Sequence, residues 1–191
     1  QNCSMNLMGN AVRIIGGDLR GRSVHFPDTA GLRPTPDRVR ETLFNWLGQR
    51  LDGQICLDLF AGSAALAFEA ISRGAAHVDT VDVSEDVCAA IRANCAKLGT
   101  TNCHVSHSSA LDFLYRNSRT FDVVFLDPPF AEKLLIENVF SVLSSHVAIG
   151  CKIYVESPNK IESPQGFRAI KTAKAGRVHF GLWEYLDKDE E

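Results

Sequence analysis

The order of apolar and polar residues predicts alternating strands and helices from residue 51 onward. Short apolar runs have the length and composition of buried strands at residues 54–60, 77–83, 102–108, 121–127 and 151–157. The intervening segments carry apolar residues at helical spacing, which predicts helices at residues 63–74, 84–99, 110–117 and 131–147. Because right-handed crossovers place such helices on both faces of a parallel sheet, we expect a doubly wound α/β fold.

The two ends of the chain depart from this alternation. Residues 166–186 contain two β-rich runs around Lys-Ala-Gly, which predicts an antiparallel hairpin closing one edge of the sheet. Residues 11–27 read as a second, shorter hairpin, and residues 36–51 as a helix with Pro36 in its first turn. The first ten residues have no periodicity and are expected to be disordered.

Charge divides the chain into unlike parts. The net charge of −3 argues against a generic nucleic-acid binder, yet residues 1–50 hold seven Arg and only four acids. Arg clusters favour bidentate contact with phosphate. We therefore expect an Arg-rich extension suited to phosphate contact over residues 1–50 and an α/β domain over residues 51–191.

Composition narrows the class of protein further. No stretch approaches 18 consecutive apolar residues and no signal-peptide pattern opens the chain, so we expect a cytoplasmic protein without a membrane partner. The six cysteines form no C-x-x-C pair and have no accompanying His tract, which indicates neither a zinc site nor a disulfide framework. We expect no metal.

In doubly wound sheets, ligands bind outside the carboxyl ends of the strands. The loops after Phe60, Val83, Ser108 and Asp127 all fall on that edge of the predicted sheet. Chemistry is therefore expected there.

The first of these loops, in CLDLFAGSAAL (56–66), fits a nucleotide-like ligand at Gly62 but matches only one glycine of the dinucleotide fingerprint. Asp58 would repel a pyrophosphate, whereas it would attract a cationic amino-acid group and a sulfonium. Asp82 follows Gly62 by 20 residues, the spacing of an acid that accepts ribose hydroxyls. The pair favours S-adenosylmethionine over NAD, and the candidate cofactor contacts are Asp58, Phe60, Ala61, Gly62, Ser63, Asp82, Val83, Ser109 and Ala110.

These residues carry a family resemblance. DLFAGS, Asp82 and LDPPF resemble the S-adenosylmethionine-dependent methyltransferases whose Asn/Asp-Pro-Pro-Tyr/Phe motif modifies planar nitrogens. With the stretch RIIGGDLRGRSVHFPDTAGLRPTPDRVRETLFNWL, the chain from about residue 12 to 186 closely resembles the ribosomal small-subunit methyltransferase D family.

The resemblance implies a Rossmann-like class I methyltransferase with a mostly parallel seven-stranded sheet. The implied reaction transfers a methyl group from S-adenosylmethionine to N2 of a guanine in 16S rRNA, position 966 in the family, and leaves S-adenosylhomocysteine. The implied partner is that RNA, free or within a small ribosomal subunit, and we expect a monomer.

Two departures from the family pattern touch the cofactor site. The family has FAGSGALG, whereas Ala64 and Ala67 replace glycines here and add methyl groups close to the cofactor wall. Ser109 stands where the family often has an acid or amide, which puts recognition of the adenine amine by that side chain in doubt.

The stretch FLDPPF predicts the catalytic loop, although two prolines after a strand also suit a simple turn. A guanine amine becomes nucleophilic when acceptors bond its N–H groups and draw the nitrogen toward tetrahedral geometry. Asp127 and the carbonyl of Pro128 are the expected acceptors, and Pro129 stiffens the loop. Phe130 is expected to stack on the base, with core packing as the alternative.

Exposed cations are expected to hold RNA phosphates. The candidates are Arg13, Arg20, Arg22, Arg33, Arg38 and Arg40 in the extension, with Lys171, Lys174 and Arg177 near the second hairpin. As alternatives, Arg38 and Arg40 pair with Asp37 and Glu41, and the hairpin cations form a solvated edge.

Other functions stay open on sequence alone. The same acceptors suit an adenine amine in DNA or a glutamine amide in a protein. A non-catalytic RNA-binding assembly factor that kept the fold is a second class, and a nicotinamide dehydrogenase is a third.

Overall fold

The fold is built on one seven-stranded sheet with the order β5-β4-β3-β6-β7-β9-β8. The computed structural model describes residues 10–29, 32–129 and 133–187. The strands are β3 (Ile55–Asp58), β4 (His77–Asp82), β5 (Cys103–His107), β6 (Phe121–Leu126), β7 (Val147–Ser157), β8 (Phe167–Ala175) and β9 (Val178–Tyr185). Strands β5, β4, β3, β6 and β7 run parallel, while β9 and β8 form the antiparallel edge. The predicted parallel sheet with a carboxy-terminal hairpin is confirmed.

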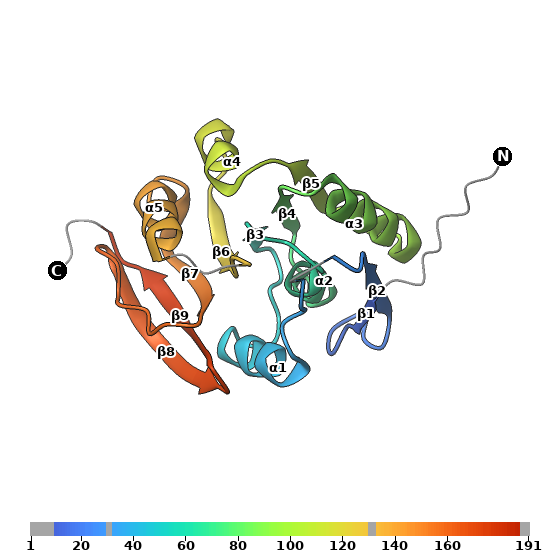
Figure 1. Ribbon diagram of the computed structural model, residues 1–191, viewed down its shortest axis with the longest axis horizontal. Coiled ribbons are helices and arrows are strands. Elements are labelled where there is room, and N and C mark those ends of the chain that lie inside the picture. The colour runs from blue at the N-terminus through green and yellow to red at the C-terminus, as the bar shows by residue number, and fades with distance from the viewer. Residues whose placement is uncertain (1–9, 30–31, 130–132, 188–191) are drawn as a thin grey trace.

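Helices cover both faces of this sheet (Figure 1). They are α1 (Asp37–Trp46), α2 (Ala65–Ser72), α3 (Glu85–Leu98), α4 (Ala110–Arg116) and α5 (Lys133–Leu143). Apolar side chains of α1, α2 and α3 pack into one core, and those of α4 and α5 into a second core across the sheet. The fold is thus the two-faced α/β arrangement that the alternation predicts.

Three predicted boundaries shift for local reasons. Helix α2 begins at Ala65 instead of residue 63 because Ala64 adopts a left-handed backbone with φ 57°. Helix α1 stops at Trp46 because Gly48 and Gln49 have φ of 90° and 70°, which no helix continues. Strand β7 begins at Val147, four residues before the predicted start, because α5 ends at Leu143 and Val147 pairs with Phe121 of β6.

The amino-terminal hairpin pairs β1 (Asn10–Arg13) with β2 (Ser23–Phe26). Asn10 pairs with Phe26, so the expectation of disorder is wrong at residue 10, while residues 1–9 lie outside the described residues. Val12, Val24 and Phe26 are buried in the same core as α2 and α3. The hairpin is therefore packed onto α2 and α3 and shares their core.

A buried carboxylate holds the hairpin, α1 and α2 together. Glu69 of α2 is fully buried and accepts hydrogen bonds from Ile15 N at 3.0 Å and Gly16 N at 2.8 Å. It also pairs with Arg40 Nη1 at 3.2 Å and with Arg73 at 3.0 Å. The next residue, Gly17, lies so close to α2 that a side chain there would overlap the Ser72 carbonyl oxygen. This explains the Gly-Gly step in the hairpin.

Arg40 belongs to this network, which corrects one prediction. Its side chain is 1% exposed, and besides Glu69 it bonds Asp37 at 2.5 Å and the carbonyl oxygens of Arg13 and Thr35. Because the guanidinium of Arg40 donates to protein acceptors and has almost no exposed surface, it cannot bind RNA phosphate. The alternative, pairing with Asp37, is confirmed.

Candidate active site

Three acids meet at the carboxyl edge of the sheet, at the ends of the adjacent strands β4, β3 and β6. Asp58 ends β3 and Asp82 ends β4, while Asp127 follows the last residue of β6. Electrostatic coupling of Asp58 with both Asp82 and Asp127 reflects their proximity. The structure therefore brings together the three carboxylates that the sequence predicts.

The loop after β3 is fixed against β4. Ala61 N donates to Val81 O at 2.9 Å, and Gly62 N donates to Asp82 Oδ2 at 3.0 Å. Asp82 Oδ1 accepts from Ser84 N at 2.9 Å. Each Asp82 oxygen retains a second lone pair, so the carboxylate is oriented and still able to accept from a ligand.

Gly62 and Ala64 both have left-handed backbones in this loop, with φ of 53° and 57°. At Gly62 an added Cβ would meet only ordinary contacts, so backbone conformation is the reason for glycine there. Ala64 adopts the same conformation with a side chain, at a cost of about 1–2 kcal/mol. Ala64 and Ala67 are fully buried in the core, where their methyl groups pack.

Asp58 is a buried acid, and no cation is paired with it in the part of the chain that the structure describes. Burial, and secondly the charge of Asp82, raise its pKa to about 7, although backbone N–H groups of Phe60 and Ala67 donate to it. A nearby cation would favour the ionised form and lower that pKa. The site is thus suited to a positively charged ligand group.

Asp127 is partly buried and accepts a hydrogen bond from the hydroxyl of Thr35. Burial first, and the adjacent Glu156 second, raise the pKa of Asp127 well above its usual range. Glu156 in turn accepts a hydrogen bond from Tyr154 Oη at 2.5 Å. The sequence reasoning missed Thr35, Tyr154 and Glu156, although Glu156 lies at the carboxyl end of an apolar strand on the ligand edge.

The remaining predicted site residues have mixed environments. Pro128 is buried and Pro129 is exposed, while Phe130 lies outside the described residues. Val83, next to Asp82, is 70% exposed, which is unusual for an apolar side chain and leaves it free to contact a ligand. Ser109 caps α4 by accepting from Asp112 N at 3.1 Å and donating to the Asp112 carboxylate, so its hydroxyl is already engaged.

The candidate RNA contacts, Arg40 apart, are exposed. They are Arg13, Arg20, Arg22, Arg33, Arg38, Lys171, Lys174 and Arg177. Arg33 and Arg38 flank Thr35, which contacts Asp127. Lys174 pairs in register with His179, which pairs with Ser157 at the carboxyl end of β7. Cations from both ends of the chain therefore lie beside the acidic edge.

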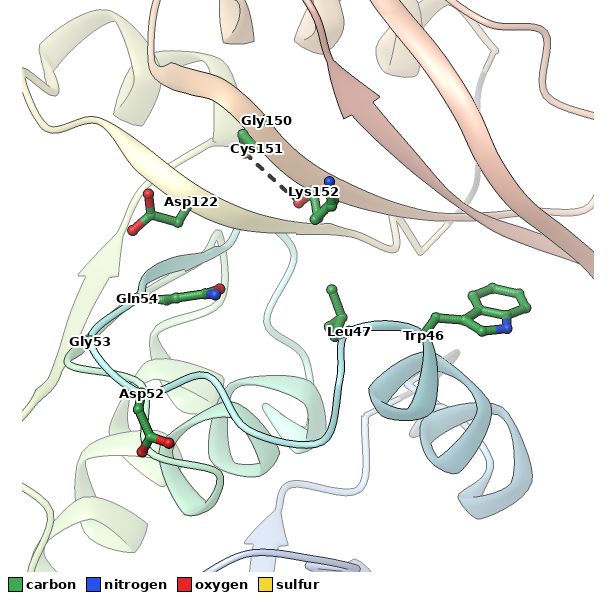
Figure 2. Close-up of a pocket in the computed structure, with 9 residues that line it drawn as sticks. All are labelled: Trp46, Leu47, Asp52, Gly53, Gln54, Asp122, Gly150, Cys151 and Lys152. Atoms are coloured by element: carbon green, nitrogen blue, oxygen red, sulfur yellow. Dashed lines mark hydrogen bonds between the residues drawn. The ribbon is translucent and has the colours of Figure 1, made fainter.

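The structure also has a cavity of about 370 Å³, and Figure 2 shows the residues that line it. It is lined by Trp46, Gln54, Asp122, Cys151 and Lys152, among others, where β3 and β6 begin. That is the opposite edge of the sheet from Asp58 and Asp127. The chemistry of the carboxyl edge, rather than the volume of this cavity, locates the candidate site.

Neither a metal-binding cluster nor a membrane-spanning helix is found among the described residues. In residues 10–29, 32–129 and 133–187, no group of three or more His, Cys, Asp or Glu side chains is arranged to hold a metal ion. Within the same ranges, no helix has the length and apolar character needed to cross a membrane.

Comparisons with known proteins agree with this geometry. A family model described as conserved hypothetical protein 95 matches residues 12–184. The ribosomal RNA small subunit methyltransferase D of Escherichia coli K12 is 41% identical over 180 residues, covering 91% of this chain and 89% of that protein. The enzyme of the same name from Haemophilus influenzae is 39% identical, covering 91% of this chain and 93% of that protein.

Solved structures show the same relationship. A structure described as a putative methyltransferase from Escherichia coli superimposes with a TM-score of 0.84 at 40% identity, covering 93% of this chain and 99% of that one. The fold is that of a Rossmann-like class I methyltransferase, as predicted. The chain belongs to the ribosomal RNA small subunit methyltransferase D family.

Proposed function

We propose that this protein transfers a methyl group from S-adenosylmethionine to the exocyclic amine of a guanine in small-subunit ribosomal RNA. The observation that carries the proposal is the set of three carboxylates, Asp58, Asp82 and Asp127, at the ends of adjacent strands. The names of the related proteins supply the class of RNA.

The residues at the edge fit the cofactor. Asp58 is a buried acid that is paired with no cation among the described residues, and the cofactor carries an ammonium and a sulfonium. Asp82 has acceptor capacity for the ribose hydroxyls, and the exposed Val83 offers an apolar contact for adenine. When bound, S-adenosylmethionine supplies a methyl group already activated by its positive sulfur.

Asp127 and the Pro128 carbonyl hold the target amine. Each accepts one N–H, which orients the nitrogen and localises its lone pair for attack. Prolines at 128 and 129 fix φ and keep both acceptors rigid. Phe130 is proposed to stack on the base. These residues position the amine and take no part in a covalent intermediate.

The pKa of Asp58 makes cofactor affinity depend on pH. Below pH 7 the ligand-free Asp58 is protonated, and a cationic ligand must expel that proton to gain the carboxylate. We expect the Kd for S-adenosylmethionine to rise about tenfold per pH unit below that value. Calorimetry between pH 5.5 and 7 measures this.

The matched variants are Asp58→Asn, which should bind weakly and without this pH dependence, and Asp86→Asn, which changes an exposed acid and should behave like wild type. An equally steep pH dependence in Asp58→Asn would refute the role of Asp58.

The exposed cations beside the site are proposed to bind phosphate. Arg38→Ala should weaken binding to small-subunit RNA and reduce the slope of log K against log salt concentration by about one. Arg116→Ala, an exposed Arg on α4 across the sheet, is the control and should leave the slope unchanged. Point variants are preferable to truncation, since removing the hairpin would expose its core residues.

The substrate form is proposed to be RNA within a partly or fully assembled subunit, handled by a monomer in the cytoplasm. Residues 1–50 hold a charge of +3 while the whole chain is −3, so ribosomal proteins are expected to complete the docking surface. Methylation rates on naked 16S rRNA, intact small subunits and protein-stripped subunits test this. Equal rates on all three would exclude a role for the proteins.

A further inference from the structure

A second carboxylate lies beside Asp127 at the end of the neighbouring strand. Strands β6 and β7 pair in parallel with Leu126 opposite Val155, so Asp127 and Glu156 are the next residues along on each strand. Their side chains are close enough to hydrogen bond. In the proposed reaction, Asp127 and the Pro128 carbonyl hold the amine, and Glu156 has no role.

Glu156 is held in a defined orientation. Tyr154, fully buried two residues earlier on the same face of β7, donates its hydroxyl to Glu156 Oε1 at 2.5 Å. Glu156 itself is only partly buried, so its carboxylate is reachable from the edge of the sheet. Tyr154 therefore occupies Oε1 of Glu156, and the Glu156 carboxylate lies within hydrogen-bonding reach of Asp127, beside the proposed amine site.

The hydrogen-bonding edge of guanine complements two neighbouring acceptors. Guanine carries the N1–H donor directly beside its N2 amine, so two adjacent donors point the same way. Adenine presents an amine beside an unprotonated N1, and cytosine presents an amine beside an unprotonated N3. A fixed carboxylate beside the amine site bonds the first pattern and repels the lone pair of the other two.

We propose that Glu156 selects guanine by accepting its N1–H while Asp127 accepts an N–H of the amine. This inference rests on the proposed function and adds the group that reads the base. Glu156 is a specificity residue in this account, and Tyr154 is the residue that positions it. Such a site rejects a base lacking the matching donor because a buried polar group is then left unpaired.

The test uses 2,6-diaminopurine, which keeps the C2 amine of guanine but has a lone pair at N1. Small subunits are reconstituted with 16S rRNA carrying either guanine or 2,6-diaminopurine at the methylated position, and kcat/KM is measured by methyl transfer. Wild-type protein should prefer guanine by roughly tenfold or more. Glu156→Gln should lose most of that preference, because its amide can donate N–H to the N1 lone pair.

A control variant, a second site variant and a binding measurement test whether Glu156 is responsible for the preference. Glu162→Gln, an exposed acid beyond the same strand, should discriminate like wild type. Tyr154→Phe removes only the orienting hydroxyl and should lower the preference partially, which gives a second test if Glu156→Gln folds poorly. Calorimetric affinity for S-adenosylmethionine should be unchanged in both site variants.

An unaltered guanine preference in Glu156→Gln or Tyr154→Phe that binds cofactor normally would overturn the inference and leave the proposed function intact. Absence of methyl transfer by wild-type protein to guanine-containing subunits would instead overturn the proposed function, and the role of Glu156 with it.

Discussion

Asp127→Ala is expected to reduce methyl transfer to small-subunit RNA by about 10²–10³-fold, the usual effect of removing one acceptor or donor aligned with the reacting group. The loss should appear in kcat, because Asp127 is proposed to hold the amine and not the cofactor. Single-turnover assays with labelled cofactor measure the rate, and calorimetry should show near wild-type affinity for S-adenosylmethionine. Unchanged turnover would remove Asp127 from the mechanism.

Asp127→Asn separates charge from geometry. It keeps one acceptor oxygen but cannot titrate, so it should retain partial activity. Wild-type turnover should rise with pH through the raised pKa of Asp127, because the carboxylate is a stronger acceptor for the amine than the neutral acid, and the variant should lack this rise.

The ionisation of Asp127 also makes the free energy of unfolding depend on pH. The pKa of Asp127 is higher in the folded protein than its unfolded value of 3.8, so the folded state holds the proton more tightly. Its contribution to stability is therefore present below pH 3.8 and is lost as the pH rises through the folded value. Asp127→Asn should be more stable than wild type at neutral pH, and the difference should vanish near pH 4.

Glu69→Ala is expected to lower the free energy of unfolding by about 3–5 kcal/mol, because it leaves the buried Arg40 and Arg73 without their shared partner. It also removes the acceptor for two backbone N–H groups of the hairpin. Urea unfolding followed by circular dichroism measures the change.

The control for this prediction is Glu41→Gln, which alters an exposed acid on α1 and should change stability by less than about 0.5 kcal/mol. A Glu69→Ala loss as small as that of the control would show that the buried network is not what holds the hairpin to α2.

The sequence predicted the features that depend on local pattern. Strand and helix order follow from periodicity, and Ser84 and Gly99 mark the ends of α3 as observed. The positions of Asp58, Asp82 and Asp127 at one edge follow from parallel pairing alone, since every parallel strand ends on the same side.

Features that depend on side-chain contacts between distant segments were not predictable. Arg40 reads as a surface cation within α1, and only its burial against Glu69, 29 residues away, shows its structural role. Thr35 and Glu156 meet Asp127 from separate elements, so no spacing rule connects them. The left-handed backbone of Ala64 was not predictable either. An alanine in place of the family's glycine gives no sign that the residue keeps a conformation typical of glycine.

The most direct test of the central claim is transfer of tritiated methyl from S-adenosylmethionine to small ribosomal subunits, followed by nucleoside identification. We expect label in a single N2-methylguanosine of the 16S rRNA, lost in Asp127→Ala. Label in adenine or in protein, or no label with protein that binds the cofactor, would contradict it.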